Sequence, residues 1–367
     1  MKIPFVDLRA QYRAHKQEID QAIQSVIDAT AFIGGKPVRA FEDAFSRAYG
    51  VAHCVGVGNG TDAIYVAMKM LGIGAGDEVI TTACTWIATA ETITQCGARP
   101  VFVDVDEFFN IDVRAVEAAI TTKTRAVIPV HLYGQAAQVD VLSALCQSRG
   151  IRLIEDCAQA HFAERLGRRV GTIGDVATLS FYPGKNLGAY GDAGAIITND
   201  EALARNCRTY ANHGSLVKHQ HVIEGINSRL DGIQAAILSA KLPHILAWTR
   251  ARVRVAQWYD EKLAGVNQLI RPAVRDGSTH VYHLYVVRVA KRDGLREHLT
   301  SCGVETGVHY PTPLPFLEAY RYLGHAPGDF PLSERNQTEI LSLPIYPEMT
   351  EEMVDYVVAC IGSFMNR

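Results

Sequence analysis

Long apolar runs are missing from this sequence of 367 residues, and no stretch approaches the length of a membrane-spanning helix. The N-terminal residues MKIPFVDLRAQYR carry Pro4 and Asp7 where a secretory signal needs an apolar segment. Charge is nearly balanced, with a formal net charge of -3 and an isoelectric point of about 6.5. No overall field would attract nucleic acid or an anionic membrane, so we expect neither partner, and any anionic ligand must be bound locally.

Paired cysteines are also absent, because the eight cysteines form no CxxC motif. Several fall within apolar segments, where free cysteines behave as small core residues, so we expect reduced thiols and a cytoplasmic protein. The sequence contains no GxSxG, HExxH or P-loop motif, which disfavours hydrolases, metalloproteases and NTPases. His219 and His221 form a pair, but their polar loop indicates no third ligand, so no metal site is predicted.

The length exceeds that of a usual single core, so two domains in one compact subunit are expected. Hydrophobic residues make up 48% of the chain, which is enough to fill both cores. After Asn227 the alternating short segments give way to one long helical segment, which indicates a junction. We assign residues 1–245 to a large domain and residues 246–367 to a smaller C-terminal one.

The first half of the chain alternates strand-like and helical segments. Two helices are expected at residues 11–29 and 38–49, with Gly34, Gly35 and Pro37 as a stop between them. Apolar strands that alternate with helices are typical of a mostly parallel sheet covered on both faces, and ligands of such sheets gather at the carboxyl ends of the strands. The strands are predicted at residues 78–82, 99–105, 126–130 and 152–155, and the helices at 61–71, 87–96, 113–120 and 139–148.

The remainder of the chain predicts a smaller α+β unit. A long helix is expected over residues 230–263, with a bend at Pro243, because proline removes a helical hydrogen bond. A stiff proline loop, PTPLPF, occupies residues 311–316. The other elements predicted here are strands at residues 281–289 and 304–309 and helices at 293–302 and 351–364.

One lysine stands out because it lies in a glycine-rich loop directly after a predicted buried strand. Residues 176–182 are mostly apolar, Pro183 and Gly184 end the strand, and Lys185 follows, before a second short strand at residues 195–198. A lysine among apolar and glycine neighbours is partly desolvated, which favours its neutral, nucleophilic form. By itself the pattern also fits an exposed lysine in a hairpin loop.

A second glycine-rich stretch, GVGNGTDAIYVAMKML at residues 56–71, opens a predicted helix. Free amides at the helix start, the helix dipole and the Thr61 hydroxyl would form a phosphate site. A dinucleotide fingerprint is the rival, but the spacing is GxGxG instead of GxGxxG and the preceding strand is weak. A third interpretation is a simple turn with Thr61 or Asp62 as the helix cap.

A carboxylate ends the apolar strand in IRLIEDCAQAH at residues 151–161. Burying Asp156 is costly unless it meets a cation, such as a protonated ring nitrogen or an arginine, although it could also cap the next turn. Trp86, which opens another helix, could stack on a planar ring or pack in the core. Pyridoxal phosphate requires a phosphate site, an aromatic face, a carboxylate and a lysine in its binding site, and all four are expected at one edge of the sheet.

Six segments, in this order, carry a resemblance to a known family: GNGTDA, TWIATAE, EDCAQAH, SFYPGKNLGAYGDAGAI, NSRLDGIQAAIL and GVHYPTPLP. They span nearly the whole chain and resemble the sugar aminotransferases of the DegT/DnrJ/EryC1/StrS family. The resemblance implies the type I aminotransferase fold, an α/β architecture whose mostly parallel sheet is flanked by helices, with a smaller C-terminal α+β domain. It also implies a homodimer whose active sites are shared between the subunits.

The resemblance assigns roles around pyridoxal 5'-phosphate, with pyridoxamine 5'-phosphate as an intermediate form. Lys185 is implied as the catalytic residue that forms the Schiff base and shuttles protons, and Asp156 as the partner of the ring nitrogen. The other implied contacts are Gly60, Thr61 and Ser180 with the phosphate, Trp86 with the ring face, Gln159 with the 3-hydroxyl, and Asn227 with the phosphate in the partner subunit.

Substrate contacts are implied in the same way. Arg229 would bind a substrate or donor carboxylate in the partner's site, which suits a bidentate guanidinium. The sequence PGKNLGAYGD resembles the branch that acts on 3-keto nucleotide sugars more than the 4-keto branch. In that branch Tyr182, His309 and Tyr310 would line the sugar pocket. Lys218 would lie near the nucleotide's pyrophosphate.

We therefore predict the transfer of an amino group, from glutamate, to a nucleotide-linked 3-keto sugar of the dTDP-3-keto-6-deoxyhexose type, in O-antigen or other polysaccharide or glycoside biosynthesis. The donor and the pathway follow from the resemblance. Alternatives within the class are a UDP-3-keto hexuronate, a 4-keto sugar and a cyclitol ketone. Alternatives from other classes are an NAD-dependent sugar oxidoreductase and a non-catalytic regulatory binding protein. The resemblance implies that such regulators replace the lysine, so its presence favours transamination.

Overall fold

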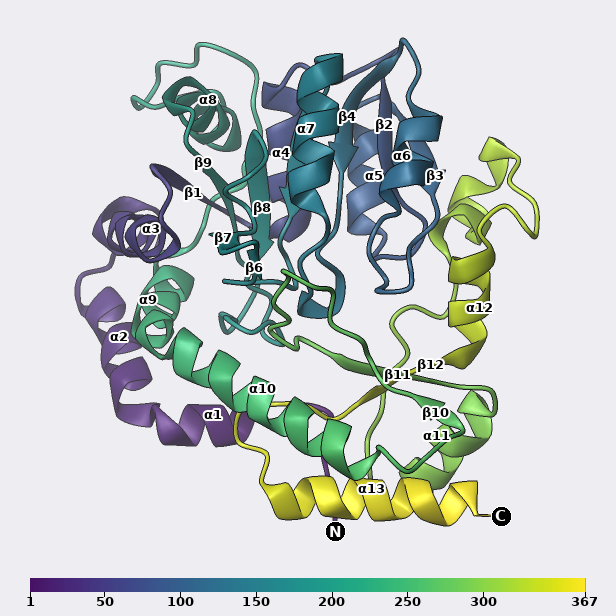
Figure 1. Ribbon diagram of the computed structural model, residues 1–367. Helices are drawn as coiled ribbons and strands as arrows, with labels where there is room; N and C mark the ends of the chain where they lie inside the picture. The colour runs from purple at the N-terminus through teal and green to yellow at the C-terminus, as the bar shows by residue number, and fades with distance from the viewer. Residues whose placement is uncertain (367) are drawn as a thin grey trace.

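A seven-stranded sheet forms the centre of the computed structural model, which describes residues 1–366 (Figure 1). From one edge to the other its strands are β1 (His53–Val57), β9 (Gly194–Thr198), β8 (Val176–Ser180), β5 (Arg152–Asp156), β4 (Thr124–Ile128), β2 (Glu78–Thr82) and β3 (Arg99–Val103). The run from β8 to β3 is parallel, whereas β9 pairs antiparallel with both β8 and β1. The prediction of a mostly parallel sheet is confirmed.

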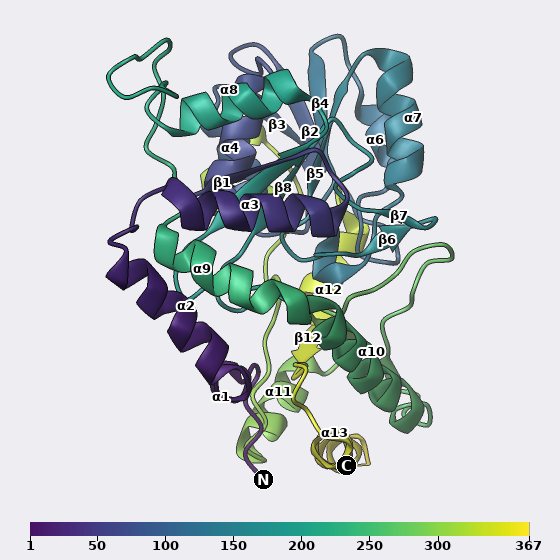
Figure 2. The same ribbon diagram turned by 90° about the vertical axis from the view of Figure 1, so that its left-hand side faces the viewer.

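Helices cover both faces of this sheet (Figures 1 and 2). Side chains alternate between the faces along each strand, so Ile154 packs into one core and its neighbour Leu153 into another. One face is covered by α4 (Gly60–Met70), α5 (Ala88–Gln95) and α8 (Glu201–Ala211). The other face is covered by α3 (Gly35–Tyr49), α6 (Val113–Ala119), α7 (Val139–Arg149) and α9 (Gly232–Lys241).

The C-terminal part of the chain builds a smaller α+β unit. Its antiparallel sheet consists of β10 (Leu269–Ile270), β11 (Tyr285–Val289) and β12 (Ile340–Leu343). Its helices are α10 (Ile245–Lys262), α11 (Arg292–Ser301), α12 (Pro331–Glu339) and α13 (Glu351–Met365). Ile3, at the other end of the chain, packs in the core of this unit. The division at residues 245 and 246 stays a prediction.

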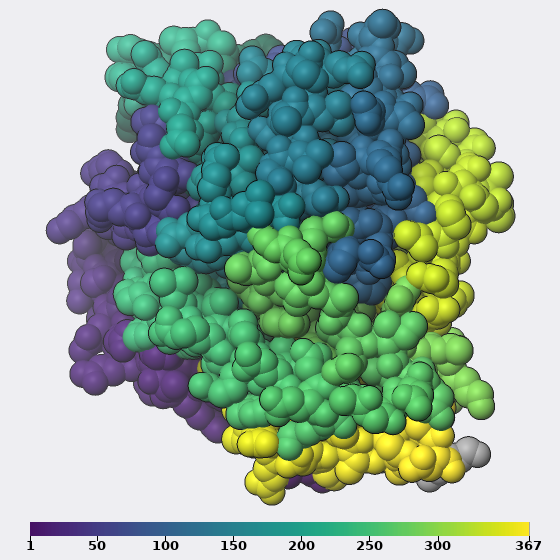
Figure 3. All heavy atoms as spheres, viewed as in Figure 1, coloured from purple at the N-terminus to yellow at the C-terminus, as the bar shows by residue number. Residues whose placement is uncertain are grey.

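The C-terminal part also packs closely against the large sheet. In Figure 3 the green segment around residues 270–280 lies against blue and teal residues. His280 forms a β-bridge with Gln135, and Ser278 forms one with Arg165. Arg165 belongs to a small hairpin of β6 (Glu164–Arg165) and β7 (Arg168–Arg169). These contacts bring the segment that follows residue 280 close to the carboxyl ends of the parallel strands in the large sheet.

The N-terminal helices differ from the prediction. The helix expected over residues 11–29 is two helices, α1 (Leu8–Ala14) and α2 (Lys16–Asp28), separated at His15 with φ -122° and ψ 20°. Gly35 and Pro37 lie in the first turn of α3 and do not form a stop before it. Proline is tolerated there because the first turn needs no intrahelical donor at that position.

The strand expected over residues 304–309 is wrong. That segment makes isolated bridges at Val304, to Ile3, and at Gly307, to Ser342. The bend expected at Pro243 is confirmed, because a 3-10 turn over Leu242–His244 joins α9 to α10. Further 3-10 turns lie at Leu132–Gly134, Leu314–Phe316 and Glu318–Leu323.

The cysteines agree with the prediction of a reduced core. All eight are free thiols, and every one except Cys302 is buried. Within residues 1–366, no helix combines the length and the apolar character that a bilayer crossing requires.

Candidate active site

Lys185 lies in a tightly folded loop between β8 and β9. The Phe181 amide donates to the Ala193 carbonyl at 2.8 Å, which ties the two ends of the loop together. At Gly188 a Cβ atom would lie 2.3 Å from the Pro183 carbonyl oxygen, so glycine is needed for this fold. The loop therefore holds Lys185 at the carboxyl end of β8, as the glycine pattern predicts.

The Lys185 amine and the Asp156 carboxyl group are close enough that each changes the pKa of the other. Burial lowers the pKa of Lys185 to about 8, and the charge of Asp156 acts in the opposite direction. Burial raises the pKa of Asp156, while hydrogen bonds and the charge of Lys185 act against that rise. An amine with a pKa near 8 can both accept and return a proton near neutral pH.

Asp156 ends the central strand β5 and is held by two donors. The Thr89 hydroxyl, from α5, donates to Oδ2 at 3.0 Å, and the Ala158 amide donates to Oδ1 at 3.1 Å. The residue is only 4% exposed, and a buried carboxylate needs such partners. The two bonds fix the direction in which Asp156 presents its charge.

Gln159 lies three residues after Asp156 and forms hydrogen bonds with two tyrosines. Its Oε1 accepts from the Tyr133 amide at 2.7 Å, and its Nε2 donates to the Tyr310 hydroxyl at 3.1 Å. The second hydrogen on Nε2 stays available for a ligand. The Tyr310 ring lies 5.7 Å from that of Trp86, which is 58% exposed, so Trp86 is a surface of the site and not a core residue.

The N-terminus of α4 lies against the end of β8. A Cβ atom on Gly60 would lie 2.7 Å from the Cβ of Ser180, so glycine allows this approach. The helix cap is Asn59, whose side chain accepts from the Asp62 amide at 2.8 Å, and not Thr61 or Asp62. The first amides of a helix have no intrahelical acceptor, so Gly60 and Thr61 can donate to an anion beside the Ser180 hydroxyl.

Three histidines from distant segments lie near Lys185. Burial, with a further contribution from the Lys185 charge, lowers the pKa of His161 to about 3 and that of His309 to about 4. The same two causes lower the pKa of His283, whose Nδ1 lies 3.2 Å from Asn186 Oδ1. All three rings are therefore neutral at physiological pH. Within residues 1–366, Nε2 of His161 is buried without a hydrogen-bond partner.

Most of the predicted site residues come together at the carboxyl ends of the parallel strands. His309 anchors its ring through Nδ1, which lies 2.8 Å from Ser342 Oγ, and Tyr182 is 60% exposed at the start of the Lys185 loop. The gathered residues are Gly60, Thr61, Trp86, Asp156, Gln159, Ser180, Tyr182, Lys185, His309 and Tyr310.

Three predicted residues belong to a different region, the segment that joins α8 to α9. Arg229 Nη1 donates to Asn212 Oδ1 at 3.1 Å, and Asn227 forms a β-bridge with the same Asn212. Lys218 is exposed on the loop between them. Across residues 1–366, no hydrogen bond or ion pair joins these three side chains to the Lys185 loop.

Three contributing residues, Thr89, His161 and His283, were not predicted as site residues. Thr89 stands within the segment TWIATAE, in the first turn of the helix α5 that follows the strand β2, and that position is a usable signal for a side chain at the ends of the strands. His283 comes from the C-terminal part of the chain. No local pattern marks it, because packing between distant segments brings it to Lys185.

The α/β sheet and the amine held beside a strand-end carboxyl group define the class: an aminotransferase. Residues 13–362 match the DegT/DnrJ/EryC1/StrS aminotransferase family. The chain belongs to this family. The resemblance drawn from the sequence segments is thereby confirmed.

Relatives cover the chain from end to end. It is 47% identical to the "Pleiotropic regulatory protein" of Geobacillus stearothermophilus over 100% of both chains. It is 43% identical to the "dTDP-3-amino-3,4,6-trideoxy-alpha-D-glucose transaminase" of Micromonospora megalomicea subsp. nigra, over 96% of each chain. The crystal structure of S. venezuelae DesV in complex with a ketimine intermediate matches with a TM-score of 0.97 and 40% identity, over 100% of this chain and 99% of that one. The type I aminotransferase fold and sugar aminotransferase activity are thus confirmed as the fold and class of this protein.

Proposed function

We propose that this enzyme transfers an amino group from glutamate to the 3-keto carbon of a nucleotide-linked sugar, with a dTDP-linked 6-deoxyhexose as the first candidate. The observation that carries the proposal is the Lys185 amine, with its pKa of about 8, beside the buried carboxyl group of Asp156. The dTDP sugar is supported by the name of the Micromonospora relative. Glutamate is supported by the family resemblance.

The groups around Lys185 fit a phosphate-bearing cofactor. The free amides of Gly60 and Thr61 and the hydroxyl of Ser180 form a set of anion donors. A Cβ atom on Gly60 would disturb this cradle, because it would lie 2.7 Å from the Cβ of Ser180. The phosphate of pyridoxal 5'-phosphate would be held here.

The remaining donors fit the ring of that cofactor. Asp156 would pair with a protonated ring nitrogen, the free hydrogen of Gln159 Nε2 would reach the ring hydroxyl, and Trp86 would cover one face. When bound, pyridoxal phosphate would supply a ring that accepts electrons as the donor carbon loses its proton.

Lys185 would hold and move the proton. Its pKa of about 8 leaves Nζ able to take a proton from the reacting carbon and to return it on the other side. The neutral rings of His161 and His309 add no positive charge beside it. A protonated ring there would lower the basicity of the amine further.

We also propose a homodimer in which one subunit completes the site of the other. Within one described chain, the Arg229 side chain bonds to Asn212, and no hydrogen bond or ion pair joins Asn227, Arg229 or Lys218 to the Lys185 loop. Arg229 uses one guanidinium nitrogen on Asn212, which leaves donors for the carboxylate of glutamate. Lys218 would face the pyrophosphate of the nucleotide, and Asn227 the cofactor phosphate.

The sugar itself would lie between aromatic and imidazole side chains of one subunit. Tyr182, His309 and Tyr310 would line this pocket, and the exposure of Tyr182 leaves its ring open to a large ligand. We place the reaction in the cytoplasm, because free thiols are characteristic of reducing compartments. The product would serve O-antigen or other glycoside biosynthesis.

A product analysis tests the proposed function. The purified protein is incubated with pyridoxal phosphate, glutamate and a panel of 3-keto and 4-keto sugars linked to dTDP or UDP, and amino sugars are identified by mass spectrometry and NMR. We expect a 3-amino sugar from the dTDP-linked 3-keto compound. A product formed only from a UDP-linked or 4-keto compound corrects the substrate. Tight sugar binding without any amino product favours a regulatory protein, as the Geobacillus relative is named.

A further inference from the structure

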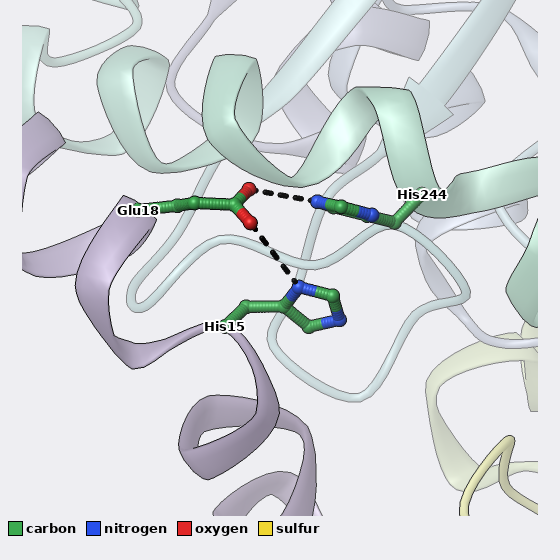
Figure 4. A group of neighbouring side chains, drawn as sticks. All are labelled: His15, Glu18 and His244. Carbon is green, nitrogen blue, oxygen red and sulfur yellow. Dashed lines mark hydrogen bonds and ion pairs between the residues drawn. The ribbon is translucent and has the colours of Figure 1, made fainter.

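Three potential metal ligands meet outside the candidate active site, where the N-terminal helices contact the start of α10 (Figure 4). His15 separates α1 from α2, Glu18 lies in the first turn of α2, and His244 ends the 3-10 turn before α10. In Figure 4 a nitrogen of each ring faces one oxygen of the Glu18 carboxylate. Because Glu18 and His244 are 226 positions apart, the cluster joins two distant segments.

The distances approach those of a coordination site. His244 Nε2 lies 2.8 Å from Glu18 Oε2, and His15 Nδ1 lies 3.8 Å from Glu18 Oε1. One ligand atom from each residue lies within 4.8 Å of the other two. Tetrahedral zinc with bonds of about 2.0–2.1 Å places its ligand atoms about 3.3 Å apart. The two histidine contacts reach different oxygens of Glu18 and need to change by roughly half an ångström, whereas atoms 4.8 Å apart would need to approach by up to about 1.5 Å.

The chemistry of the donors selects the class of ion. Two imidazoles and one carboxylate are the protein ligands of open zinc sites and suit first-row transition metals, whereas calcium and magnesium prefer oxygen ligands. We propose that His15, Glu18 and His244 bind one divalent transition-metal ion, such as Zn²⁺, with water in the remaining position.

The surroundings fix the ligands and leave them accessible. The His15 ring lies 4.0 Å from that of His244 and 5.3 Å from that of Trp248, so packing holds both imidazoles in place. The Glu18 side chain is 53% exposed, which gives an ion a path from solvent. Burial and the charge of His244 lower the pKa of His15, and the charge of Lys241 contributes least. The Lys241 ammonium group donates to the Gly188 carbonyl at 2.5 Å, which holds it in place without removing its charge.

A second cluster contains similar side chains, but it is buried and its groups are already used in hydrogen bonds. His131, Glu155 and Cys157 also lie within ligand distance of one another, but all three are buried. The carboxylate of Glu155 already accepts from three backbone amides within residues 171–174, and His131 Nδ1 accepts from the Ala137 amide. Glu18, by contrast, contacts only the two histidines among the hydrogen bonds and ion pairs described for residues 1–366.

Metal binding here would fasten α2 to the joint between α9 and α10. Lys241, the last residue of α9, contacts Gly188 in the loop that carries Lys185, so the end of α9 also supports the candidate active site. We expect the ion to act on stability, since none of its ligands belongs to the proposed catalytic set. The inference is therefore independent of the proposed function.

Zinc binding to the holoenzyme is the test. Purified protein is freed of metal with a chelator that is then removed, and Zn²⁺ is titrated against a chromophoric chelator with wild type, His15→Gln, His244→Gln and Glu18→Gln. We expect each substitution to weaken one zinc site by at least about tenfold. Thermal unfolding is measured in parallel, and added Zn²⁺ should raise the unfolding temperature of the wild type but not of the variants.

A matched control separates this site from other zinc-binding groups. His325 lies 3.4 Å from Asp329 in a histidine–carboxylate pair that does not belong to the three-ligand cluster, so His325→Gln should bind Zn²⁺ as the wild type does. Glu18→Gln keeps the test usable if a histidine variant fails to fold, because the carboxylate is half-exposed. The proposal is overturned if the wild type binds no Zn²⁺ or if Glu18→Gln binds it as tightly as the wild type.

Discussion

Two opposing influences on Lys185 decide its reactivity. Burial favours the neutral amine, and the neighbouring Asp156 favours the charged one. Burial prevails, because the pKa falls from 10.5 to about 8. In the cofactor-free protein the neutral fraction therefore rises with pH around that value, well below the range of an ordinary lysine.

Removing the charge of Asp156 should lower the pKa of Lys185 further, because the influence that raises it is lost. We expect an amine-specific reagent to label Lys185 in the cofactor-free wild type with a midpoint near pH 8, and in Asp156→Asn with a lower midpoint. Peptide mass spectrometry over a pH series measures both, and the peptide of exposed Lys123 serves as the reference. A wild-type midpoint near 10.5, or an upward shift in the variant, contradicts this account.

The sequence was sufficient for those residues that a local pattern marks. Lys185 follows a buried strand and stands among glycines, and Asp156 ends an apolar strand, so the sequence places both at the carboxyl ends of the strands. His161 and His283 are different. Their proximity to Lys185 depends on how the loops and the C-terminal segment pack, which no spacing within the sequence encodes.

At the scale of elements, the proposed cofactor cradle would depend on the close approach of α4 to the end of β8. Gly60→Ala would place a Cβ atom 2.7 Å from the Cβ of Ser180, so the helix start must move. We expect a loss of stability of about 1–3 kcal/mol, as for other overpacked sites. Pyridoxal phosphate affinity should fall at least about tenfold, which corresponds to about 1.4 kcal/mol. Titration by visible absorbance and thermal unfolding measure the two effects.

Gly362→Ala is the matched control, because it makes the same substitution in the helix α13, where a Cβ atom meets nothing within 4 Å. This variant should gain about 0.5–1 kcal/mol of stability, since alanine is the better helix former, and keep the cofactor affinity of the wild type. Equal cofactor affinity in both variants would show that the approach of Gly60 to Ser180 does not matter.

Periodicity in the sequence predicts some of the helices and strands but not all of them. The β-α alternation located β2, β4, β5 and the helices between them, because each element carries its own periodicity. The segment 304–309 has a strand-like pattern, yet its chain pairs at isolated positions with Ile3 and Ser342. The break at His15 was also missed, because the apolar spacing continues across it from α1 to α2.

At the scale of the whole molecule, the proposed site would be completed by a second copy of the chain. Across residues 1–366, no hydrogen bond or ion pair joins Asn227, Arg229 or Lys218 to the Lys185 loop, and the loop that carries Lys218 exposes apolar side chains. These are Leu216 at 47%, Val217 at 55%, Val222 at 74% and Ile223 at 43% exposed. Such a patch is costly in water and is compatible with burial against a second copy.

Mixed dimers test the sharing of sites. Lys185→Ala and Arg229→Ala should each be inactive alone, because each removes a group that every site needs. Co-refolding equal amounts should restore about one quarter of wild-type activity, because half of the dimers are mixed and each holds one intact site. Product formation after mixing, with light scattering to confirm the dimer, measures this. No recovery in mixed dimers would contradict a site built from two subunits.

The central claim is that Lys185 is the amine that binds the cofactor aldehyde. Borohydride reduction of the holoenzyme fixes the cofactor to the residue that holds it, and peptide mass spectrometry then locates the added mass. The account predicts the adduct on the peptide containing Lys185 and no adduct in Lys185→Arg. An adduct on another lysine of the active wild-type enzyme would contradict it.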